Sequence, residues 1–291
     1  MSSRFSFGGD EHLFVECDER MSFDGFFRSL AATRTLRAQA PPGITEICPG
    51  NASYQIRFDP DIIHPDEVLT LVQAVDRTAG SSEPVIDTRI IEIPVFYDDP
   101  WTRETLMRFR ERHQDASGSD LDYVARINGF ISATDFVAAH HRSPWFVTMV
   151  GFVCGAPWFY QLVERERQLQ APKYVRPRTD TPRHTIAHAG CFTCIYPVRG
   201  AGGYQMFGIT PLQIYDPDEK LDYMPQELVL FRPGDIVKFR PIEREEYDRI
   251  VDAVARNSFV PRIRPAHFDL REFERDMESY NATLIEALNR D

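Results

Sequence analysis

The sequence predicts an α+β protein with two main structural parts. In residues 1–95, short strand-like segments alternate with two helix-like segments, in the order β-α-β-β-α-β of the split βαβ, or ferredoxin-like, arrangement. Residues 144–242 instead contain short β-branched and aromatic runs separated by glycine and proline, which predicts a β-barrel or sandwich. We expect four segments: 1–95, a helical connection at 96–143, the β-rich domain at 144–257 and a helical tail at 258–291.

The first part is expected to contain four strands and two helices. Ser22 can cap the first helix, because its hydroxyl can accept a hydrogen bond from a free N–H at the helix start. The apolar residues that follow recur at helical spacing, and they are Phe23, Phe26, Phe27 and Leu30. Pro65 suits the first turn of the second helix, which ends near Gly80. The expected strands are Leu13–Cys17, Ile44–Cys48, Tyr54–Phe58 and Ile86–Tyr97.

Helical patterns flank the β-rich region on both sides. Before it they cover Thr102–His113 and Leu121–Ile127, and a third helix opens at Ser132. After it, Glu243–Arg256 predicts a charged helix, and the tail ends in an amphipathic stretch. The apolar side of that stretch comprises Leu270, Phe273 and Met277.

Composition and charge exclude several classes of partner. The 33 basic and 44 acidic side chains give a net charge of −11, which argues against a nucleic-acid or anionic-membrane surface. No apolar run approaches the ~20 residues that cross a bilayer, and residues 1–10 lack the features of a signal peptide. The five cysteines are odd in number and scattered, which fits a reducing compartment. The cytoplasm is the expected location.

Two kinds of site are not expected. The sequence has no P-loop, no dinucleotide-binding glycine pattern and no Gly-x-Ser-x-Gly elbow, so any ATP would be used by a partner. His184, His188, Cys191 and Cys194 suggest zinc, but their spacing differs from that of zinc knuckles. In a strand, moreover, the two cysteines would take opposite faces. We therefore predict no metal site.

A series of motifs resembles one known superfamily. Gly190–Pro197 is followed by Gly202–Gly208, where a glycine-rich strand and an Ile-Tyr-Pro step precede a Gly-Gly-Tyr-Gln segment. Upstream lie Gly155-Ala156-Pro157 and Lys173–Thr179. Together these segments resemble the superfamily of KipI, allophanate hydrolase subunit 1 and the B subunit of 5-oxoprolinase, and especially the carboxyltransferase domain of urea carboxylase. The resemblance extends over nearly the whole chain from Leu13 onward.

The resemblance implies a ferredoxin-like N-terminal domain followed by a cyclophilin-like β-barrel with flanking helices. It also implies a second barrel subunit, similar to KipA or allophanate hydrolase subunit 2, with the site between the two. The chain lacks the Met-Lys-Met motif for biotin attachment, so no cofactor is expected to be covalently bound. Carboxybiotin would come from another protein, with biotin carboxylase and biotin carrier protein as further partners.

The expected catalytic residues are Lys173, Arg178, Tyr204 and Gln205. The first two, assigned mainly from the resemblance, would bind a carboxylate, for which arginine is well suited. The amide of Gln205 offers a donor and an acceptor, the complement of a urea or lactam edge. The expected substrate-binding residues are Gly155, Ala156, Pro157, Tyr174, Thr193 and Gly203. If these residues have no catalytic role, Lys173 and Arg178 belong to an ordinary solvated basic loop, and Tyr204 and Gln205 belong to an ordinary barrel strand.

Two departures from the family pattern bear on function. The chain has Ile209 where the family usually has arginine, and Arg183-His184 where it usually has Ala-Gly. The leading hypothesis is a carboxyltransferase-type subunit acting on a small urea-, guanidine- or lactam-like substrate. An ATP-dependent 5-oxoprolinase-type subunit is the alternative within the superfamily. The departures also leave open a non-catalytic, KipI-like regulator, and a stand-alone peptide binder is a third class.

Overall fold

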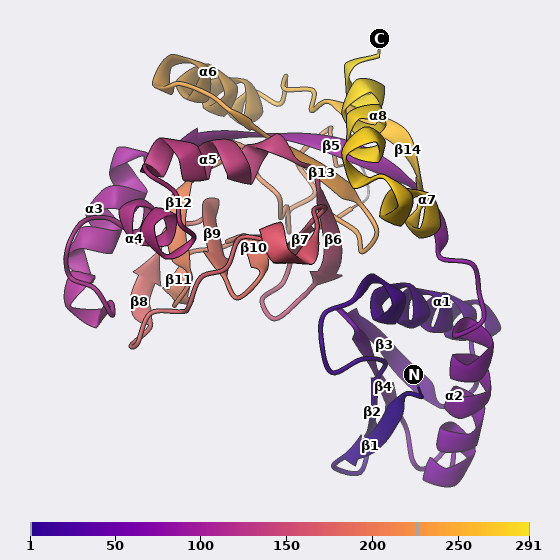
Figure 1. Cartoon of the computed structure of the whole chain (residues 1–291). Helices are drawn as coiled ribbons and strands as arrows, with labels where there is room; N and C mark the ends of the chain where they lie inside the picture. Colours follow the sequence, from indigo (N-terminus) through magenta and orange to yellow (C-terminus); the bar gives the residue numbers. More distant parts are fainter. Residues whose placement is uncertain (1, 225–226, 291) are drawn as a thin grey trace. The chain divides into compact units, whose positions relative to one another are not determined.

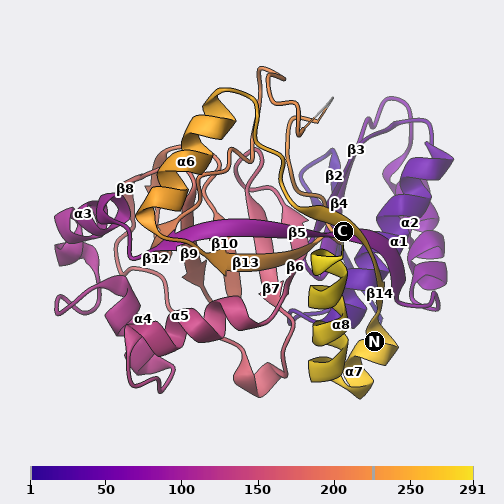
Figure 2. The ribbon, with the colours of Figure 1, turned by 90° about the horizontal axis from the view of Figure 1, so that it is seen from above.

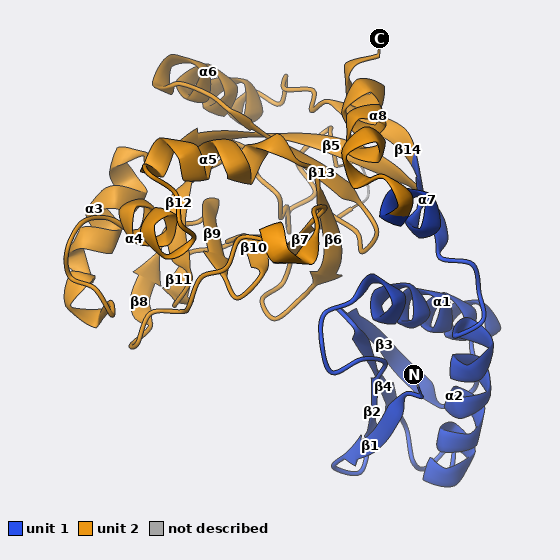
Figure 3. Cartoon of the chain, viewed as in Figure 1, with its two compact units in different colours: residues 1–86, 267–274 blue, residues 87–266, 275–291 orange. Residues whose placement is uncertain are grey.

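The computed structural model describes residues 2–224 and 227–290, which form two compact units (Figure 3). The first unit comprises the chain up to Ile86 together with His267–Glu274, and the second comprises Asp87–Ala266 together with the chain from Arg275. The chain contains a four-stranded and an eight-stranded sheet, and helices occur between the strands along the sequence (Figure 1). This mixed composition agrees with the predicted α+β class.

The first unit packs two helices against its four-stranded sheet. Its elements are β1 (Arg4–Gly8), β2 (His12–Glu16), α1 (Phe23–Gln39), β3 (Ile44–Gly50), β4 (Ser53–Phe58) and α2 (Pro65–Ala79). The strand order is β1-β2-β4-β3, with every pair antiparallel. Ser22 caps α1 as predicted, and its hydroxyl accepts from the Gly25 N–H. The core is formed by alternate residues of β2 and β4 and by the apolar stripe of α2.

The strand predicted at residues 86–97 exists, but its expected pairing is wrong. It is β5 (Val85–Tyr97), and it pairs with strands of the second unit. The place beside β2 is taken by β1, which the sequence did not reveal. The difference follows from burial, because Ile90, Ile91, Ile93 and Val95 are all fully buried. Apolar residues on both faces are typical of a strand enclosed on both sides rather than of a half-exposed edge.

The second unit is built around the eight-stranded sheet. The strands of this sheet besides β5 are β6 (Trp145–Val150), β7 (Pro157–Gln161), β9 (Thr185–Ala189), β10 (Phe192–Ile195), β12 (Gln205–Ile209), β13 (Ile236–Pro241) and β14 (Ile263–Asp269). The last three residues of β14 belong to the first unit. The order is β12-β9-β10-β7-β6-β13-β5-β14, and β12 also pairs with β5. Within the described residues, these pairings close all the strands except β14 into a ring. A separate ribbon joins β8 (Arg178–Thr181) to β11 (Gly200–Gly202).

Closure of the ring depends on Gly208. This residue pairs with Tyr97 on β5, and a Cβ placed on it would come within 2.4 Å of the Phe96 carbonyl oxygen. Only glycine allows the two backbones to approach so closely. Inside the ring, large side chains fill the core, among them Trp145, Phe159, Phe207 and Phe239.

Helices and short 3₁₀ turns cover the ring. They are α3 (Pro100–Arg108), η1 (Arg110–Arg112), α4 (Asp120–Ile127), α5 (Ala133–Arg142), η2 (Arg165–Arg167) and α6 (Arg244–Ala255). Ser132 caps α5 as predicted. Figures 1 and 2 show α5 running along the β5–β13 pair, and α3 and α4 lie at β12. Among the described residues, no helix is long and apolar enough to span a membrane.

The single helix predicted over 102–113 is wrong. Helix α3 ends at Arg108, its C-cap Phe109 adopts φ −106° and ψ 16°, and a 3₁₀ turn follows. In that turn, Arg110 pairs with the buried carboxylate of Asp120, a contact between distant residues that the local helical pattern does not encode.

The C-terminal region adds β14, α7 (Leu270–Arg275) and α8 (Met277–Asn289). The helices were predicted, but β14 was not. Residues 267–274 belong to the first unit, where Phe268 stacks on Phe27 with ring centroids 6.1 Å apart. Phe273 lies edge-on to Phe23 at 5.8 Å. The core of the first unit is therefore completed by a distant part of the sequence.

Candidate functional site

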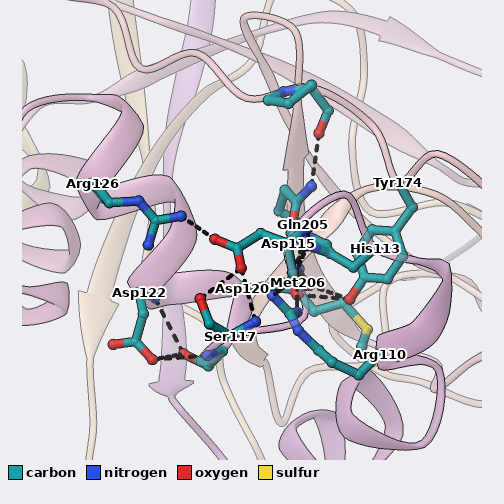
Figure 4. Close-up of polar contacts among 12 residues, drawn as sticks. Arg110, His113, Asp115, Ser117, Asp120, Asp122, Arg126, Tyr174, Gln205 and Met206 are labelled. Carbon is teal, nitrogen blue, oxygen red and sulfur yellow. Dashed lines mark hydrogen bonds and ion pairs between the residues drawn. The ribbon is translucent and has the colours of Figure 1, made fainter.

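A fully buried carboxylate, Asp120, organises one region of the second unit (Figure 4). Arg110 Nη1 donates to it at 2.6 Å, and the Tyr174 hydroxyl lies 2.7 and 2.8 Å from its two oxygens. The backbone N–H of Met206 also donates to it, at 2.8 Å. These bonds join the start of α4, the loop before β8 and the start of β12. A buried charge with this many donors is stabilised where an isolated one would not be.

Gln205 lies beside this carboxylate and is fully buried. Its Nε2 donates to the Pro172 carbonyl at 2.8 Å, so its Oε1 faces His113 Nε2, also at 2.8 Å. Because the amide oxygen only accepts, the Nε2 of His113 must carry a proton. Both ends of the Gln205 amide are thus engaged within the chain.

Arg178 is a buried cation without a carboxylate partner. It is 0% exposed, and within the described part of the chain it forms no ion pair with an acidic side chain. Its guanidinium stacks over the Tyr174 ring at 4.4 Å and reaches Thr181 Oγ1 at 3.4 Å. Its Nη1 makes no hydrogen bond among the described residues. A desolvated charge and an unused donor are costly in a folded protein, so this arrangement favours an anionic occupant.

Lys173 provides a second positive charge in the same region. It is exposed, and its Nζ lies 5.5 Å from the centroid of the Tyr204 ring. Burial raises the pKa of the Cys194 thiol, while the charges of Arg178 and Lys173 oppose that shift. Both cations therefore lie close enough to Cys194, on the outer face of β10, to affect its pKa. The loop is held there by the Tyr174 N–H, which donates to the Gly203 carbonyl at 2.7 Å.

Six of the predicted residues are brought together here: Lys173, Tyr174, Arg178, Gly203, Tyr204 and Gln205. The turn Gly155-Ala156-Pro157 is linked to them only indirectly. Gly155 has φ +78° and lies against Tyr215, and Pro157 begins β7. The next residue, Trp158, lies edge-on to Tyr204 with ring centroids 5.5 Å apart.

Thr193 is not part of this group. It alternates with Cys194 on β10, so it faces the interior of the ring. There its hydroxyl lies 3.0 Å from His140 Nε2 and 2.9 Å from His188 Nδ1. Tyr97 OH and His140 Nδ1 are 2.9 Å apart at one end of this buried relay. At the other end of the relay, His188 Nε2 faces the carbonyl oxygens of Leu169 and Gly190.

The direction of every hydrogen bond in the relay can be assigned. Carbonyl oxygens only accept, so His188 Nε2 carries a proton and its Nδ1 accepts from Thr193. Thr193 then accepts from His140 Nε2, and the Nδ1 of His140 accepts from Tyr97. Burial lowers the pKa of His188 to about 4 and that of His140 well below its usual value. Both rings are therefore neutral near pH 7, which suits a structural relay.

The four residues considered for zinc are dispersed. His188 lies in the interior relay, whereas Cys194 is on the outer face of β10. Among the described residues, no group of three or more His, Cys, Asp or Glu side chains is arranged to hold a metal ion.

Asp120, His113 and Arg110 were not predicted from the sequence. Acidic residues are common in the first turn of a helix, so nothing distinguished Asp120 from Asp122, which forms the capping box with Ser119. The only signal was the density of Arg110, His113 and Asp115 before the helix. That pattern is equally typical of an exposed polar loop.

Chemically, the site offers two cations and an aromatic surface on the outer face of the ring. Arg178 and Lys173 can bind a carboxylate or a developing oxyanion, and preorganised donors of this kind stabilise acyl-transfer transition states. The Tyr204 ring lies under Lys173 and edge-on to Trp158, so it helps to fix the position of the lysine. Asp120 is a positioning residue, because it fixes Tyr174 and β12 without facing the open surface.

The ring of strands that β12 and β5 close makes the second unit a β-barrel, and Lys173 and Arg178 lie on its outer side. The chain belongs to the family of the carboxyltransferase domain, subdomains C and D, whose model matches residues 3–224. The family resemblance inferred from the sequence motifs is therefore confirmed.

Three relatives illustrate the range of this family. The chain is 29% identical over 222 residues to the B subunit of 5-oxoprolinase from Bacillus subtilis, a match that covers 72% of this chain and 83% of that protein. It is 28% identical over 214 residues to urea amidolyase of Saccharomyces cerevisiae, covering 72% of this chain but 12% of the relative. The crystal structure of Kluyveromyces lactis urea carboxylase matches with a TM-score of 0.85 at 21% identity, over 99% of this chain and 26% of that one. The chain thus spans most of one relative and a small part of the others.

Proposed function

We propose that this chain is a carboxyltransferase-type component that binds a small carboxylated or ureido-type substrate at Lys173 and Arg178. The observation that supports this most directly is the buried Arg178 guanidinium, which has no carboxylate partner in the described part of the chain and an unused Nη1 donor. Evolution rarely retains such a charge without a compensating anion, because its desolvation is costly. A bound carboxylate would supply the missing acceptor.

The neighbouring groups fit the rest of such a substrate. Lys173 is exposed beside Tyr204, so it can approach a second oxygen of the ligand. Gln205, by contrast, would act by holding β12 and the loop at Pro172 unless its internal hydrogen bonds exchange on binding. We therefore assign direct contact to Lys173, Arg178 and Tyr204, and positioning to Gln205 and Tyr174.

Carboxybiotin delivered by another protein fits this donor set. Its carboxylate is the kind of acceptor that Arg178 Nη1 lacks, and Lys173 would be the second residue to hold it. When bound, carboxybiotin supplies a labile carboxyl group. The contribution of this chain would be to orient that group and to neutralise its charge.

We also propose that the chain works with a second, related barrel subunit. The support is the name of the Bacillus subtilis relative, which is one subunit of an enzyme, and the multidomain length of the urea amidolyases. Biotin carboxylase and a biotin carrier would complete a carboxylase of this type. In fold, we propose that the two units are ferredoxin-like and cyclophilin-like, on the basis of the β2-α1-β3-β4-α2 order and the closed ring.

A second candidate function is that of an ATP-dependent 5-oxoprolinase-type component acting on a lactam. It is favoured by one observation, since the match covers 83% of the Bacillus subtilis 5-oxoprolinase subunit, which is a separate chain. In that case ATP would be used by a partner, and Arg178 and Lys173 would bind the lactam's carboxylate.

The test measures binding of N-carbamoylglycine, which carries both a ureido group and a carboxylate, by calorimetry on the full chain. Lys173→Met and Arg178→Met should each weaken binding about tenfold or more, because each removes a charge-assisted hydrogen bond. Arg176→Met is the matched control, since Arg176 is exposed three residues from Lys173. An equal effect of all three variants would contradict the proposed site.

Turnover separates the two candidate functions. The chain is co-expressed with a related barrel subunit, and ATP consumption is measured with urea, guanidine or 5-oxoproline. Dependence on bicarbonate and a biotinylated protein supports the carboxyltransferase. Turnover of 5-oxoproline without either supports the lactam-opening function. No turnover of any of these compounds would overturn both.

A further inference from the structure

A separate cleft of about 530 Å³ lies in the second unit. Its walls come from α6, the start of α3, the turn before β9 and the chain at and after the end of β12. None of the residues grouped around Arg178 lines it. It is instead lined by His184 and Ile209, two of the positions where the sequence departs from the family pattern. Residues far apart in the sequence are thus combined in one cavity of a size typical for small ligands.

The cleft is mainly apolar and partly aromatic. Trp101 and Tyr247 lie with ring centroids 5.2 Å apart, and Val251 and Val254 of α6 extend this wall. Trp101 is 36% exposed and Val251 is 38% exposed, so the wall is open to solvent. Exposed apolar side chains gathered in a concave site mark a place where an apolar group can be bound.

Three polar groups at the cleft have no partner within the described part of the chain. The Arg183 guanidinium is exposed and forms no ion pair or hydrogen bond with the described residues, and the His184 ring nitrogens and the Tyr247 hydroxyl form no hydrogen bond with them either. Burial and the nearby charge of Arg183 lower the pKa of His184 to about 4. Its ring is therefore neutral near pH 7 and can donate one hydrogen bond.

The acidic groups in the neighbourhood are already engaged. Asp180 binds Arg199 and Arg108, and Asp99 caps α3. Arg199, the other cation of the cleft, is thus neutralised, whereas Arg183 is not. The lining of the cleft therefore carries one unpaired cation, Arg183, beside an apolar surface, which is the complement of an amphipathic anion.

We propose that this cleft binds a small carboxylate with an apolar, preferably aromatic, body. The carboxylate pairs with Arg183 and accepts from His184 or Tyr247. The apolar body packs on Trp101, Val251 and Ile209. This site is distinct from the one proposed at Lys173 and Arg178, so the failure of either leaves the other standing.

The experiment titrates the full chain with three probes: 3-phenylpropionate, the neutral 3-phenyl-1-propanol and acetate. Binding is measured by calorimetry and located by the NMR signal of the Trp101 indole N–H. We expect 3-phenylpropionate to saturate below roughly 10 mM, as a ligand of ordinary efficiency and this size would. The alcohol and acetate should each bind about tenfold more weakly or worse, because each lacks half of the recognised chemistry.

Three variants sharpen the test. Arg183→Gln should weaken binding of 3-phenylpropionate about tenfold, and Val251→Trp should fill the cleft and abolish binding. Arg249→Gln is the matched control, because Arg249 is exposed on the same helix without lining the cleft, and it should bind normally. The proposal is overturned by an absence of saturable binding, by equal affinity for the acid and the alcohol, or by unchanged binding in Arg183→Gln.

Discussion

At the scale of single residues, Asp120 shows how one buried carboxylate can hold three segments together. Its neighbour in the same helical turn, Asp122, also accepts hydrogen bonds, but only from Ser119 in the local capping box. The two acids therefore differ in the contacts that each one supports. Loss of Asp120 would leave Arg110 without its carboxylate partner and would remove the acceptor of the Tyr174 hydroxyl, whereas loss of Asp122 affects only the start of α4.

We predict that Asp120→Asn lowers the free energy of unfolding by roughly 3–5 kcal/mol, because it leaves the buried Arg110 charge uncompensated. Asp122→Asn should cost about 1 kcal/mol, the usual value of a helix cap. Urea denaturation followed by circular dichroism measures both. Similar losses in the two variants would show that Asp120 is an ordinary capping acid.

The buried histidines predict an acid-sensitive fold. In the unfolded chain His188 takes up a proton near pH 6.5, whereas in the folded chain its pKa is about 4. Unfolding therefore binds protons between these values, and stability falls as the pH falls. His188 alone should cost about 2 kcal/mol between pH 7 and pH 5, with His140 adding to the loss in the same direction.

Urea denaturation at pH 7, 6 and 5 measures this loss. His188→Asn should be less stable at pH 7 but should lose less stability on acidification. A wild-type unfolding free energy that is constant from pH 7 to pH 5 would contradict the relay of neutral histidines.

At the scale of elements, the ring is closed where β12 meets β5. Gly208→Ala should cost about 3 kcal/mol of stability, because the added Cβ would meet the backbone of Phe96 and Tyr97. Gly200→Ala is the control, since a Cβ at Gly200 would meet nothing within 4 Å. Hydrogen exchange of the Asp98 N–H, which donates to the Phe207 carbonyl, should become faster only in Gly208→Ala. Equal exchange in both variants would rule out this role for Gly208.

The elements also show what the sequence could predict. Helices α1, α2 and α5 were located correctly because their start signals act within a few residues: the caps Ser22 and Ser132, and Pro65 at the first position of α2. Strands β1 and β14 were missed, and β5 was given the wrong partners. Strand pairing is decided by contacts between distant residues, and local periodicity does not encode it. The same limit applies to the site. The motifs between Lys173 and Gln205 pointed to residues that lie together in the structure, but not to Asp120, which holds Tyr174 and β12 in place.

At the scale of the whole molecule, the chain consists of two units with separate cores. Trp101, Trp145 and Trp158 all lie in the second unit, so their fluorescence monitors that unit alone. We predict that Phe268→Ala destabilises the first unit by about 3–5 kcal/mol, since it removes a buried ring from the contact with Phe27. The transition seen by circular dichroism should move to lower urea concentration, while the tryptophan transition should stay in place.

Phe152→Ala provides the control, because Phe152 is 89% exposed and its truncation should cost less than about 0.5 kcal/mol. If Phe268→Ala shifted the tryptophan and circular dichroism transitions equally, the two units would not unfold independently.

The completion of the first unit by residues 267–274 has a consequence for synthesis. A ribosome makes the chain from the N-terminus, so Phe27 emerges 241 residues before Phe268, its stacking partner. At 5–20 residues per second, that interval lasts roughly 12–48 s. Throughout it, the aromatic face of α1 has no cover from its own unit. Newly made chains should therefore be substrates for ribosome-associated chaperones until residues 267–274 have been synthesised.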